Sequence, residues 1–359
     1  CALQAVGVEP GDEVIVPGLT WVATAQAALD IGANVVLVDI DPETLCISPE
    51  AIRAAITPKT KAIIPVHLYG CMCDMDAILE IARAHDLKIV EDVAHQHGSQ
   101  WRGQGAGAIG DAGSFSFQQS KVLTCGEGGA VTCNSQDVAD TVHALKHVGF
   151  MPDRTQTWEA DARPPLTPAG RYAHNYRFTE MQAVLLRGGL SRLPEQTRIR
   201  EENVAYLTER INALGGPLRA VERDPRVTRQ AYYGMNLLFD PSQARGLRRE
   251  QYRQALSAEG CSFGTPYPPV CRHPLLNLYD RTSPVPYRDP AVMQNYAELR
   301  LPQVEKAFTE TAVIVSQQHL LGSRAYLNQW IEAMEKVNGN LDKLRDHFEA
   351  QAREAEGRA

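Results

Sequence analysis

The chain has 359 residues, of which 44% are hydrophobic and 22% are charged, and its formal net charge at pH 7 is −7. This is ordinary globular composition with ample material for a large core, and the acidic balance argues against a nucleic-acid-binding surface. No apolar run reaches the ~18 residues that a membrane span needs, and no signal peptide precedes the first predicted strand, so we expect a cytoplasmic protein.

The eight cysteines do not suggest a disulfide scaffold, because the chain is long and most of them stand where a small core residue would serve. Cys71 and Cys73 form a lone C-x-C pair without a second pair of ligands, which is a poor basis for a zinc site. We expect reduced thiols and no bound metal.

Strand and helix patterns alternate over the first hundred residues. Apolar strands are predicted at 11–17, 34–40, 61–68 and 88–93, and helices at 20–32, 48–56 and 74–85. Ser48 followed by Pro49 is typical of a helix start, and Asp74 is the expected cap of the next helix. The alternation of near-continuous apolar strands with helices predicts right-handed βαβ units in a mostly parallel sheet covered on both faces.

A glycine-rich stretch, 101–110, follows these units. It lacks the strand-then-helix context of a dinucleotide-binding fingerprint, so we predict a loop between strands. A buried strand at 114–117 then ends shortly before Lys121, and glycines at 126, 128 and 129 let the chain turn back into 130–133.

The rest of the chain completes this large domain and then predicts a second, smaller α/β domain. Helices are expected at 135–147, 177–214 with a break at 193–194, 248–259 and 323–336, a long loop at 151–171, and strands at 232–239 and 261–267. We therefore divide the chain into a large domain with its linker helix (1–215), a small C-terminal domain (216–337) and a charged tail (338–359) that is a solvated helix or disordered.

Two strand exits carry the residues with the clearest chemistry. In open α/β sheets ligands bind outside the carboxyl ends of the strands, so Asp92 and Lys121 are expected to face one crevice. An acid, then a Ser-rich strand and a lysine about 30 residues later is the layout of a pyridoxal phosphate (PLP) site. The alternative is that Lys121 is a surface lysine in a hairpin.

Five motifs in this order resemble the PLP-dependent sugar aminotransferases of the DegT/DnrJ/StrS type. They are Val16-Pro-Gly-Leu-Thr-Trp-Val-Ala-Thr-Ala25, Ile64-Pro-Val-His-Leu-Tyr-Gly70, Glu91-Asp-Val-Ala-His-Gln-His-Gly98, the stretch 113–129 around Lys121, and Asn175-Tyr-Arg-Phe-Thr-Glu-Met-Gln-Ala183. The resemblance implies an α/β fold-type I PLP enzyme, similar to aspartate aminotransferase, with a large mostly parallel sheet domain and a smaller C-terminal α/β domain.

The resemblance also implies the roles of six residues. Lys121 would hold the cofactor aldehyde as a Schiff base and move the proton during transfer, and Asp92 would keep the pyridine nitrogen protonated. The resemblance also implies that Trp21 stacks on the cofactor ring, that His95 lies near its phenolic oxygen, and that Ser116 hydrogen-bonds its phosphate. Asn175 would reach the phosphate of the cofactor bound in a partner subunit. A homodimer with shared active sites follows.

Some of these residues could instead have purely structural roles. Trp21 would otherwise be a core aromatic, and Asn175 a helix N-cap. His67 and Tyr69, at the end of the 61–68 strand, are second choices for the site, whereas His97 has no implied role.

The sequence Ser-Phe-Gln-Gln-Ser-Lys-Val-Leu-Thr around Lys121 looks most like the corresponding sequence of aminotransferases that act on scyllo-inosose with L-glutamine in aminocyclitol antibiotic pathways. Alternatives are a nucleotide keto-sugar aminotransferase, an enzyme like 3-amino-5-hydroxybenzoate synthase, a PLP-binding regulatory protein without turnover, and an α/β protein without PLP. Dehydratase relatives have histidine in place of the lysine, so Lys121 argues against that branch.

The first residues, Cys1-Ala-Leu-Gln-Ala-Val-Gly-Val8, look like the end of an amphipathic helix. In the family a loop before this helix helps to bind the cofactor phosphate. From the resemblance we expect the chain to lack roughly the first fifth of the protein, including part of that phosphate cradle.

Overall fold

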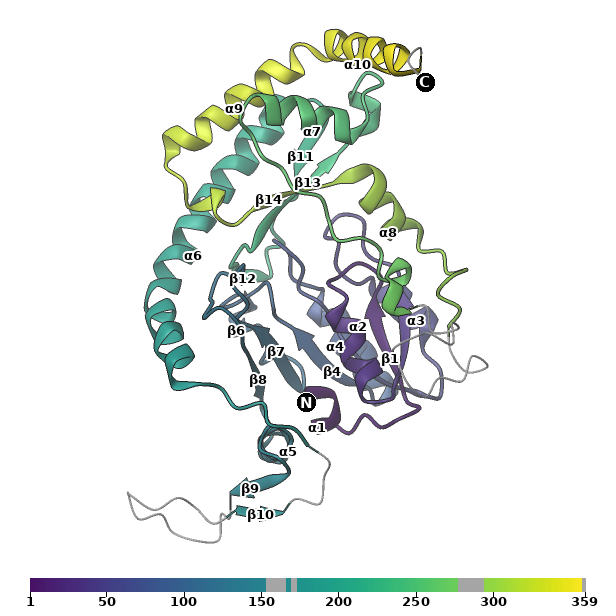
Figure 1. Ribbon diagram of the computed structural model, residues 1–359, viewed down its shortest axis with the longest axis vertical. Coiled ribbons are helices and arrows are strands. Elements are labelled where there is room, and N and C mark those ends of the chain that lie inside the picture. The colour runs from purple at the N-terminus through teal and green to yellow at the C-terminus, as the bar shows by residue number, and fades with distance from the viewer. Residues whose placement is uncertain (153–165, 169–172, 277–293, 357–359) are drawn as a thin grey trace.

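The computed structural model describes residues 1–152, 166–168, 173–276 and 294–356, and Figure 1 shows the arrangement of its elements. Part of the predicted loop at 151–171 lies outside the described residues. Its ends, β9 (Phe150–Pro152) and β10 (Leu166–Pro168), pair as a short antiparallel ribbon.

The predicted parallel sheet is confirmed. Six strands form one sheet in the order β2-β1-β3-β4-β7-β8. Their bounds are β1 (Glu13–Pro17), β2 (Asn34–Val38), β3 (Thr60–Ile63), β4 (Lys88–Asp92), β7 (Ala112–Ser116) and β8 (Gly129–Cys133). Every neighbouring pair is parallel except β7 and β8, which form an antiparallel hairpin.

Helices accompany these strands, and two of them begin directly after a cap that the sequence predicts. They are α1 (Ala2–Ala5), α2 (Ala23–Asp30), α3 (Pro49–Ala55), α4 (Met75–His85) and α5 (Gln136–Lys146). Ser48 accepts a hydrogen bond from the Ala51 N–H at the start of α3, and Asp74 accepts one from the Ala77 N–H at the start of α4. Strand residues such as Ile15 and Ile63 are fully buried between the helices, so the sheet is the centre of the first hydrophobic core.

A smaller antiparallel sheet carries a second core. Its strands lie in the order β11-β13-β14, with bounds β11 (Leu218–Ala220), β13 (Gly234–Phe239) and β14 (Ala312–Ser316). The helices α7 (Arg249–Ala258) and α9 (Arg324–Asn338) contribute Tyr252 and Trp330 to this core. A third sheet, in the order β12-β5-β6, joins β12 (Val227–Arg229) to β5 (Gln100–Trp101) and β6 (Gln104–Gly105).

The long helix α6 (Glu180–Leu214) corrects one prediction. The expected break at 193–194 is wrong, because Pro194 lies inside a continuous helix of 35 residues. A proline ring removes one backbone hydrogen bond, which a long helix tolerates when its other turns are well packed. Figure 1 shows this helix following one side of the molecule from the region of α5 to the second core.

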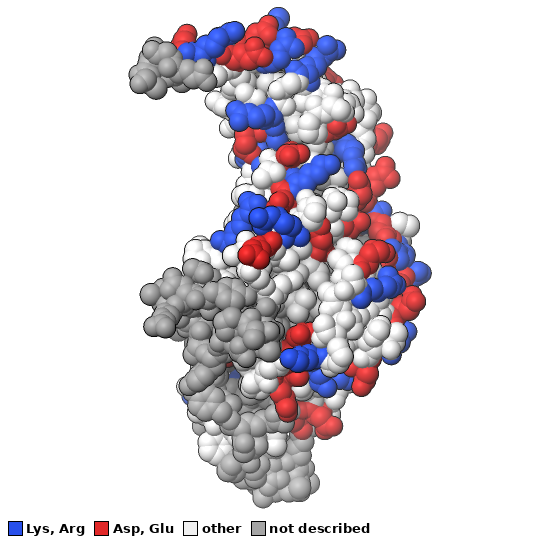
Figure 2. Space-filling view, turned by 90° about the vertical axis from the view of Figure 1, so that its right-hand side faces the viewer, with Lys and Arg blue, Asp and Glu red and all other residues white. Residues whose placement is uncertain are grey.

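Two further differences concern the C-terminal part. The predicted strand at 261–267 is wrong, since only Gly264 makes a β-bridge, to Ile314 of the unpredicted strand β14. The tail instead forms α10 (Leu341–Glu356), one of the two expected states, with Phe348 packed against the second core. Figure 2 shows acidic and basic side chains intermingled at the top of the molecule, where α10 lies.

A chain of polar contacts ties α6 to the loop after β7. Arg200 of α6 is 2% exposed, and its Nη2 donates a hydrogen bond to Gln317 Oε1 at 2.7 Å. Gln317 Nε2 in turn donates to the carbonyl oxygen of Ser120 at 2.7 Å. The backbone directly before Lys121 is therefore held from the C-terminal part of the chain.

None of the helices in the described ranges has the length and apolar character needed to cross a lipid bilayer.

Candidate active site

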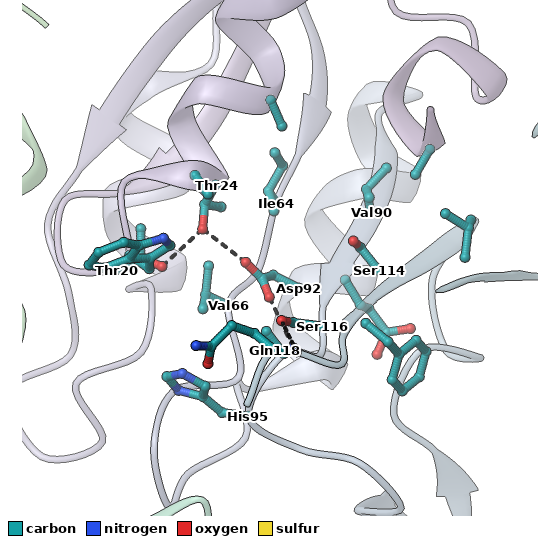
Figure 3. Close-up of a pocket in the computed structure, with 18 of the residues that line it drawn as sticks. Thr20, Thr24, Ile64, Val66, Val90, Asp92, His95, Ser114, Ser116 and Gln118 are labelled. Carbon is teal, nitrogen blue, oxygen red and sulfur yellow. Dashed lines mark hydrogen bonds between the residues drawn. The ribbon is translucent and has the colours of Figure 1, made fainter. Parts of the chain in front are cut away.

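The strands β4 and β7 end side by side, and a cavity of about 640 Å³ opens at their carboxyl ends (Figure 3). The parallel register pairs Asp92 with Ser114, so the end of β4 lies beside β7. Lys121, in the connection from β7 to β8, lines the same cavity as Asp92. The expected crevice at these strand exits is therefore present, and it has the size of a cofactor site.

The Asp92 carboxylate is held by two donors. Thr24 Oγ1, in the first turn of α2, donates to Oδ2 at 2.8 Å, and the Ala94 N–H donates to Oδ1 at 3.1 Å. Because the one proton of Thr24 is used on Asp92, Thr20 is the donor in its 3.0 Å contact with Thr24. Figure 3 shows this row of hydroxyl groups leading to Asp92, which orients one carboxylate oxygen beside the cavity.

Lys121 is the amine of the cavity. Burial lowers its pKa below the ordinary value of 10.5, and the negative charge of Asp92 opposes part of that shift. Its Nζ lies 4.7 Å from the centroid of the Tyr233 ring. A lowered pKa makes more of the neutral, nucleophilic amine available, which is what reaction with a carbonyl requires.

His95 is 4% exposed and fixed on three sides. Its Nδ1 accepts a hydrogen bond from the Tyr69 N–H at 3.1 Å, its Nε2 lies 3.3 Å from Tyr267 Oη, and its ring stacks on Tyr233 at 3.9 Å between centroids. Burial, with the nearby Lys121, puts its pKa well below the ordinary value. His95 is therefore neutral with its proton on Nε2, because Nδ1 serves as an acceptor.

Trp21 and Ser116 also line the cavity. Trp21 is 58% exposed and its ring centroid lies 5.6 Å from that of Tyr267, so the alternative of a core aromatic is wrong. The Ser116 hydroxyl accepts a hydrogen bond from the Gln118 N–H at 3.3 Å, which leaves its own O–H available to donate to a ligand.

Asn175 does not line this cavity. It is exposed and forms an isolated antiparallel bridge with His147, away from the other five predicted residues. The helix-cap alternative is wrong, since Thr179 is the N-cap of α6. The predicted contact to a partner subunit's phosphate stays a prediction.

The remaining histidines of these motifs have structural contacts. His67 is fully buried, accepts the Cys73 N–H at Nδ1 and donates from Nε2 to Glu91 at 3.1 Å. His97 donates from Nε2 to the Ser116 carbonyl oxygen at 2.8 Å, and burial lowers its pKa from 6.5 to about 4. Tyr69, the other second choice, packs behind His95 and accepts the Tyr267 N–H at its hydroxyl.

Glu91 anchors the predicted glycine-rich loop. Besides His67, its carboxylate accepts the backbone N–H groups of Gly107, Ile109 and Gly110 at 2.8 to 2.9 Å. Burial alone would raise the pKa of Glu91, but these hydrogen bonds keep it below the ordinary value. Gly107 has a φ of +86°, and a Cβ there would lie 2.7 Å from the Phe115 ring, so this turn requires glycine.

Three residues of the site were not predicted from the sequence: Thr24, Tyr233 and Tyr267. Thr24 lies in a quoted motif one helical turn after Thr20, and that spacing was the available signal. Tyr233 and Tyr267 approach His95 from more than a hundred residues away in the chain, so no local pattern indicates them.

Comparison with known proteins agrees with this geometry. The DegT/DnrJ/EryC1/StrS aminotransferase family matches residues 1–330. The chain belongs to this family. It is a PLP-dependent aminotransferase with the fold-type I architecture expected from the sequence motifs.

Three relatives illustrate the match. A Streptoalloteichus tenebrarius protein, provisionally named an L-glutamine:3-amino-2,3-dideoxy-scyllo-inosose aminotransferase, is 41% identical over 96% of this chain and 81% of its own length. The L-glutamine:scyllo-inosose aminotransferase of Streptomyces griseus is 38% identical over 96% of this chain and 80% of its own. The solved structure of an aminotransferase from Psychrobacter cryohalolentis has a TM-score of 0.81 and 32% identity, covering 95% of this chain and 84% of that one.

The residues of the cavity fit pyridoxal phosphate. A carboxylate and a buried amine line one space, which suits a ligand with a basic ring nitrogen and an aldehyde. Trp21 and Tyr267 supply flat apolar surface, and the free O–H of Ser116 suits a phosphate oxygen.

Proposed function

We propose that this aminotransferase moves an amino group from L-glutamine to a keto-cyclitol of the scyllo-inosose type, as in aminocyclitol biosynthesis. The names of the relatives from Streptoalloteichus tenebrarius and Streptomyces griseus support this donor and this class of acceptor. When bound, pyridoxal phosphate would supply an electron-withdrawing ring that carries the amino group between the two substrates.

The observation that carries the choice of acceptor is the charge of the cavity. Among the described residues that line it, Lys121 is the only lysine or arginine, whereas Asp92 and Glu127 are acidic. A nucleotide-linked keto-sugar brings a diphosphate that needs cationic partners. An uncharged polyol needs none, so the lining favours a keto-cyclitol over a nucleotide keto-sugar.

The proposed roles of the protein groups follow from their contacts. Asp92, oriented by Thr24, would keep the ring nitrogen protonated. The Lys121 amine would bind the aldehyde and afterwards carry the proton between the donor's α-carbon and the cofactor carbon, as a general base and acid. His95 would turn its Nε2 proton from Tyr267 Oη, 3.3 Å away, to the phenolic oxygen.

Trp21 would stack on the ring and Ser116 would donate to the phosphate. The division into a large domain (1–215), a small domain (216–337) and a tail is part of the same proposal, and the two separate hydrophobic cores support it.

We also propose a homodimer in which Asn175 binds the phosphate of the partner subunit. An exposed apolar surface surrounds this residue and continues along the first turns of α6; its members are Val148, Phe150, Tyr176, Phe178, Met181, Val184, Leu185 and Leu190. Exposed apolar patches of this kind mark protein interfaces. Asn175→Ala should weaken retention of pyridoxal phosphate, and size-exclusion chromatography should still give a dimer.

The proposed function is tested with purified protein loaded with pyridoxal phosphate. L-Glutamine should bleach the visible absorbance near ~400 nm, and scyllo-inosose should restore it with formation of an amino-cyclitol. Colour that L-glutamine does not bleach would favour a binding protein without turnover or another donor. Amination of nucleotide keto-sugars but not of scyllo-inosose would overturn the proposed acceptor.

A further inference from the structure

The side chain of Gln118 points its amide into the cavity, and the mechanism above does not use it. Gln118 follows β7 by two residues and lines the cavity with His95 and Lys121. Figure 3 shows it on the same side of the pocket as His95. The adjacent Gln119 is exposed and does not line the cavity.

The orientation of this amide is fixed by Ser120. The Ser120 N–H donates to Gln118 Oε1 at 2.8 Å, and the Ser120 hydroxyl donates to the same oxygen at 2.7 Å. A backbone N–H can only donate, so the atom that faces Ser120 must be the amide oxygen. The amino group, Nε2, then makes no hydrogen bond to any residue that the structure describes.

Ser120 is itself held from the small sheet. Its hydroxyl proton is used on Gln118, so in the 3.0 Å contact with Tyr233 the tyrosine O–H is the donor. The hydrogen bonds thus run in one direction, from Tyr233 to Ser120 to Gln118. The same Tyr233 stacks on His95 and lies against Lys121 Nζ. The free N–H₂ donor is therefore held in a fixed orientation in the same cavity as the reactive amine.

We propose that Gln118 determines acceptor specificity by donating a hydrogen bond from Nε2 to an oxygen of the keto-cyclitol ring. This inference rests on the proposed function. An uncharged polyol offers only neutral oxygens, which a neutral amide donor matches, whereas the carboxylate of an amino-acid donor is better matched by a cation. A pre-oriented donor loses little rotamer freedom on binding and discriminates against rings that lack the oxygen.

The experiment compares Gln118→Met with the matched control Gln119→Met in protein loaded with pyridoxal phosphate. Gln118→Met should raise the KM for scyllo-inosose about ten-fold, the factor expected for one neutral hydrogen bond, with kcat changed less. The rate at which L-glutamine bleaches the cofactor should stay that of the parent. Gln119→Met should leave both quantities unchanged.

A second variant tests the same hydrogen-bond chain without changing Gln118, in case Gln118→Met fails to fold. Tyr233→Phe keeps the ring stack on His95 and removes only the first donor of the hydrogen-bond chain, so the KM for scyllo-inosose should rise by a smaller factor than in Gln118→Met. An unchanged KM in both variants would overturn the inference while leaving the proposed function intact. A slowed L-glutamine half-reaction in Gln118→Met would also overturn it, because the amide would then serve the donor. If the parent aminates no keto-cyclitol, the proposed function fails and this inference with it.

Discussion

Glu91 and Asp92 are adjacent carboxylates at the end of β4, and their surroundings differ sharply. Glu91 is fully buried and accepts four hydrogen bonds, three from the backbone of one loop and one from His67. Asp92 accepts two and stands at the cavity. Successive strand residues point to opposite faces, so one carboxylate organises the structure behind the sheet while its neighbour remains available for chemistry.

The sharpest test of this contrast is Asp92→Asn, which keeps the shape and removes the charge. Transamination should fall on the order of a thousand-fold, as for the loss of one preorganised electrostatic contact at a reacting group. The free energy of unfolding of the unliganded protein should change little, because Asp92 has few contacts. Single-turnover kinetics and urea unfolding measure the two quantities, and a large loss of stability with retained activity would reverse the assignment.

Glu91→Gln should give the opposite result. An amide cannot accept all four hydrogen bonds, since its N–H₂ group faces donors, so unfolding should become easier by about 4 kcal/mol. The protein that remains folded should still react with L-glutamine at a rate close to that of the parent. Urea unfolding followed by circular dichroism checks the first expectation, and equal stability of variant and parent would contradict it.

Acid should destabilise the region behind Ser116 through His97. This histidine is neutral in the folded protein, where burial lowers its pKa from 6.5 to about 4, and it becomes protonated more readily when unfolded. The unfolded state therefore binds more protons between those two pH values, and stability should fall by roughly 3 kcal/mol as the pH drops from 6.5 to 4.

Substitution His97→Gln should remove this part of the pH dependence while keeping a donor to the Ser116 carbonyl. His85, which is exposed, serves as the control through His85→Gln. The measurement is the free energy of unfolding at several pH values, and equal slopes for His97→Gln and the parent would show that His97 does not carry the effect.

The smallest expected effect concerns the hydroxyl behind Asp92. Thr24→Val removes the donor to Oδ2 and should lower the rate of the L-glutamine half-reaction about ten-fold, which corresponds to about 1.4 kcal/mol and lies within the range for one hydrogen bond. Thr20→Val removes the more distant donor and should have a smaller effect. If Thr20→Val lowered this rate more than Thr24→Val does, the proposed order of hydrogen bonds, from Thr20 to Thr24 to Asp92, would be contradicted.

The sequence was sufficient to predict the parallel sheet, because strands and helices alternate in it. It was also sufficient to predict that Asp92 and Lys121 line one cavity, because both follow the carboxyl ends of strands in a βαβ fold. It was insufficient for Tyr233 and Tyr267, whose place beside His95 depends on how the second sheet packs. The predicted break at 193–194 was wrong because it rested on the local propensity of Pro194, whereas the long helix α6 continues through this residue. The pattern at 261–267 likewise looked like a strand, although only Gly264 finds a partner.

The tie from Arg200 through Gln317 to the carbonyl of Ser120 bears on the order of events during synthesis. The first half of the chain leaves the ribosome with the acid and the amine already present, but Gln317, which donates to the carbonyl before the lysine, follows 197 residues after Ser120. Domains generally fold from the N-terminus as they emerge. A nascent chain therefore carries its reactive lysine on a loop that lacks the contacts of Tyr233 and Gln317 until those residues have been added, and the finished pocket is a late product of translation.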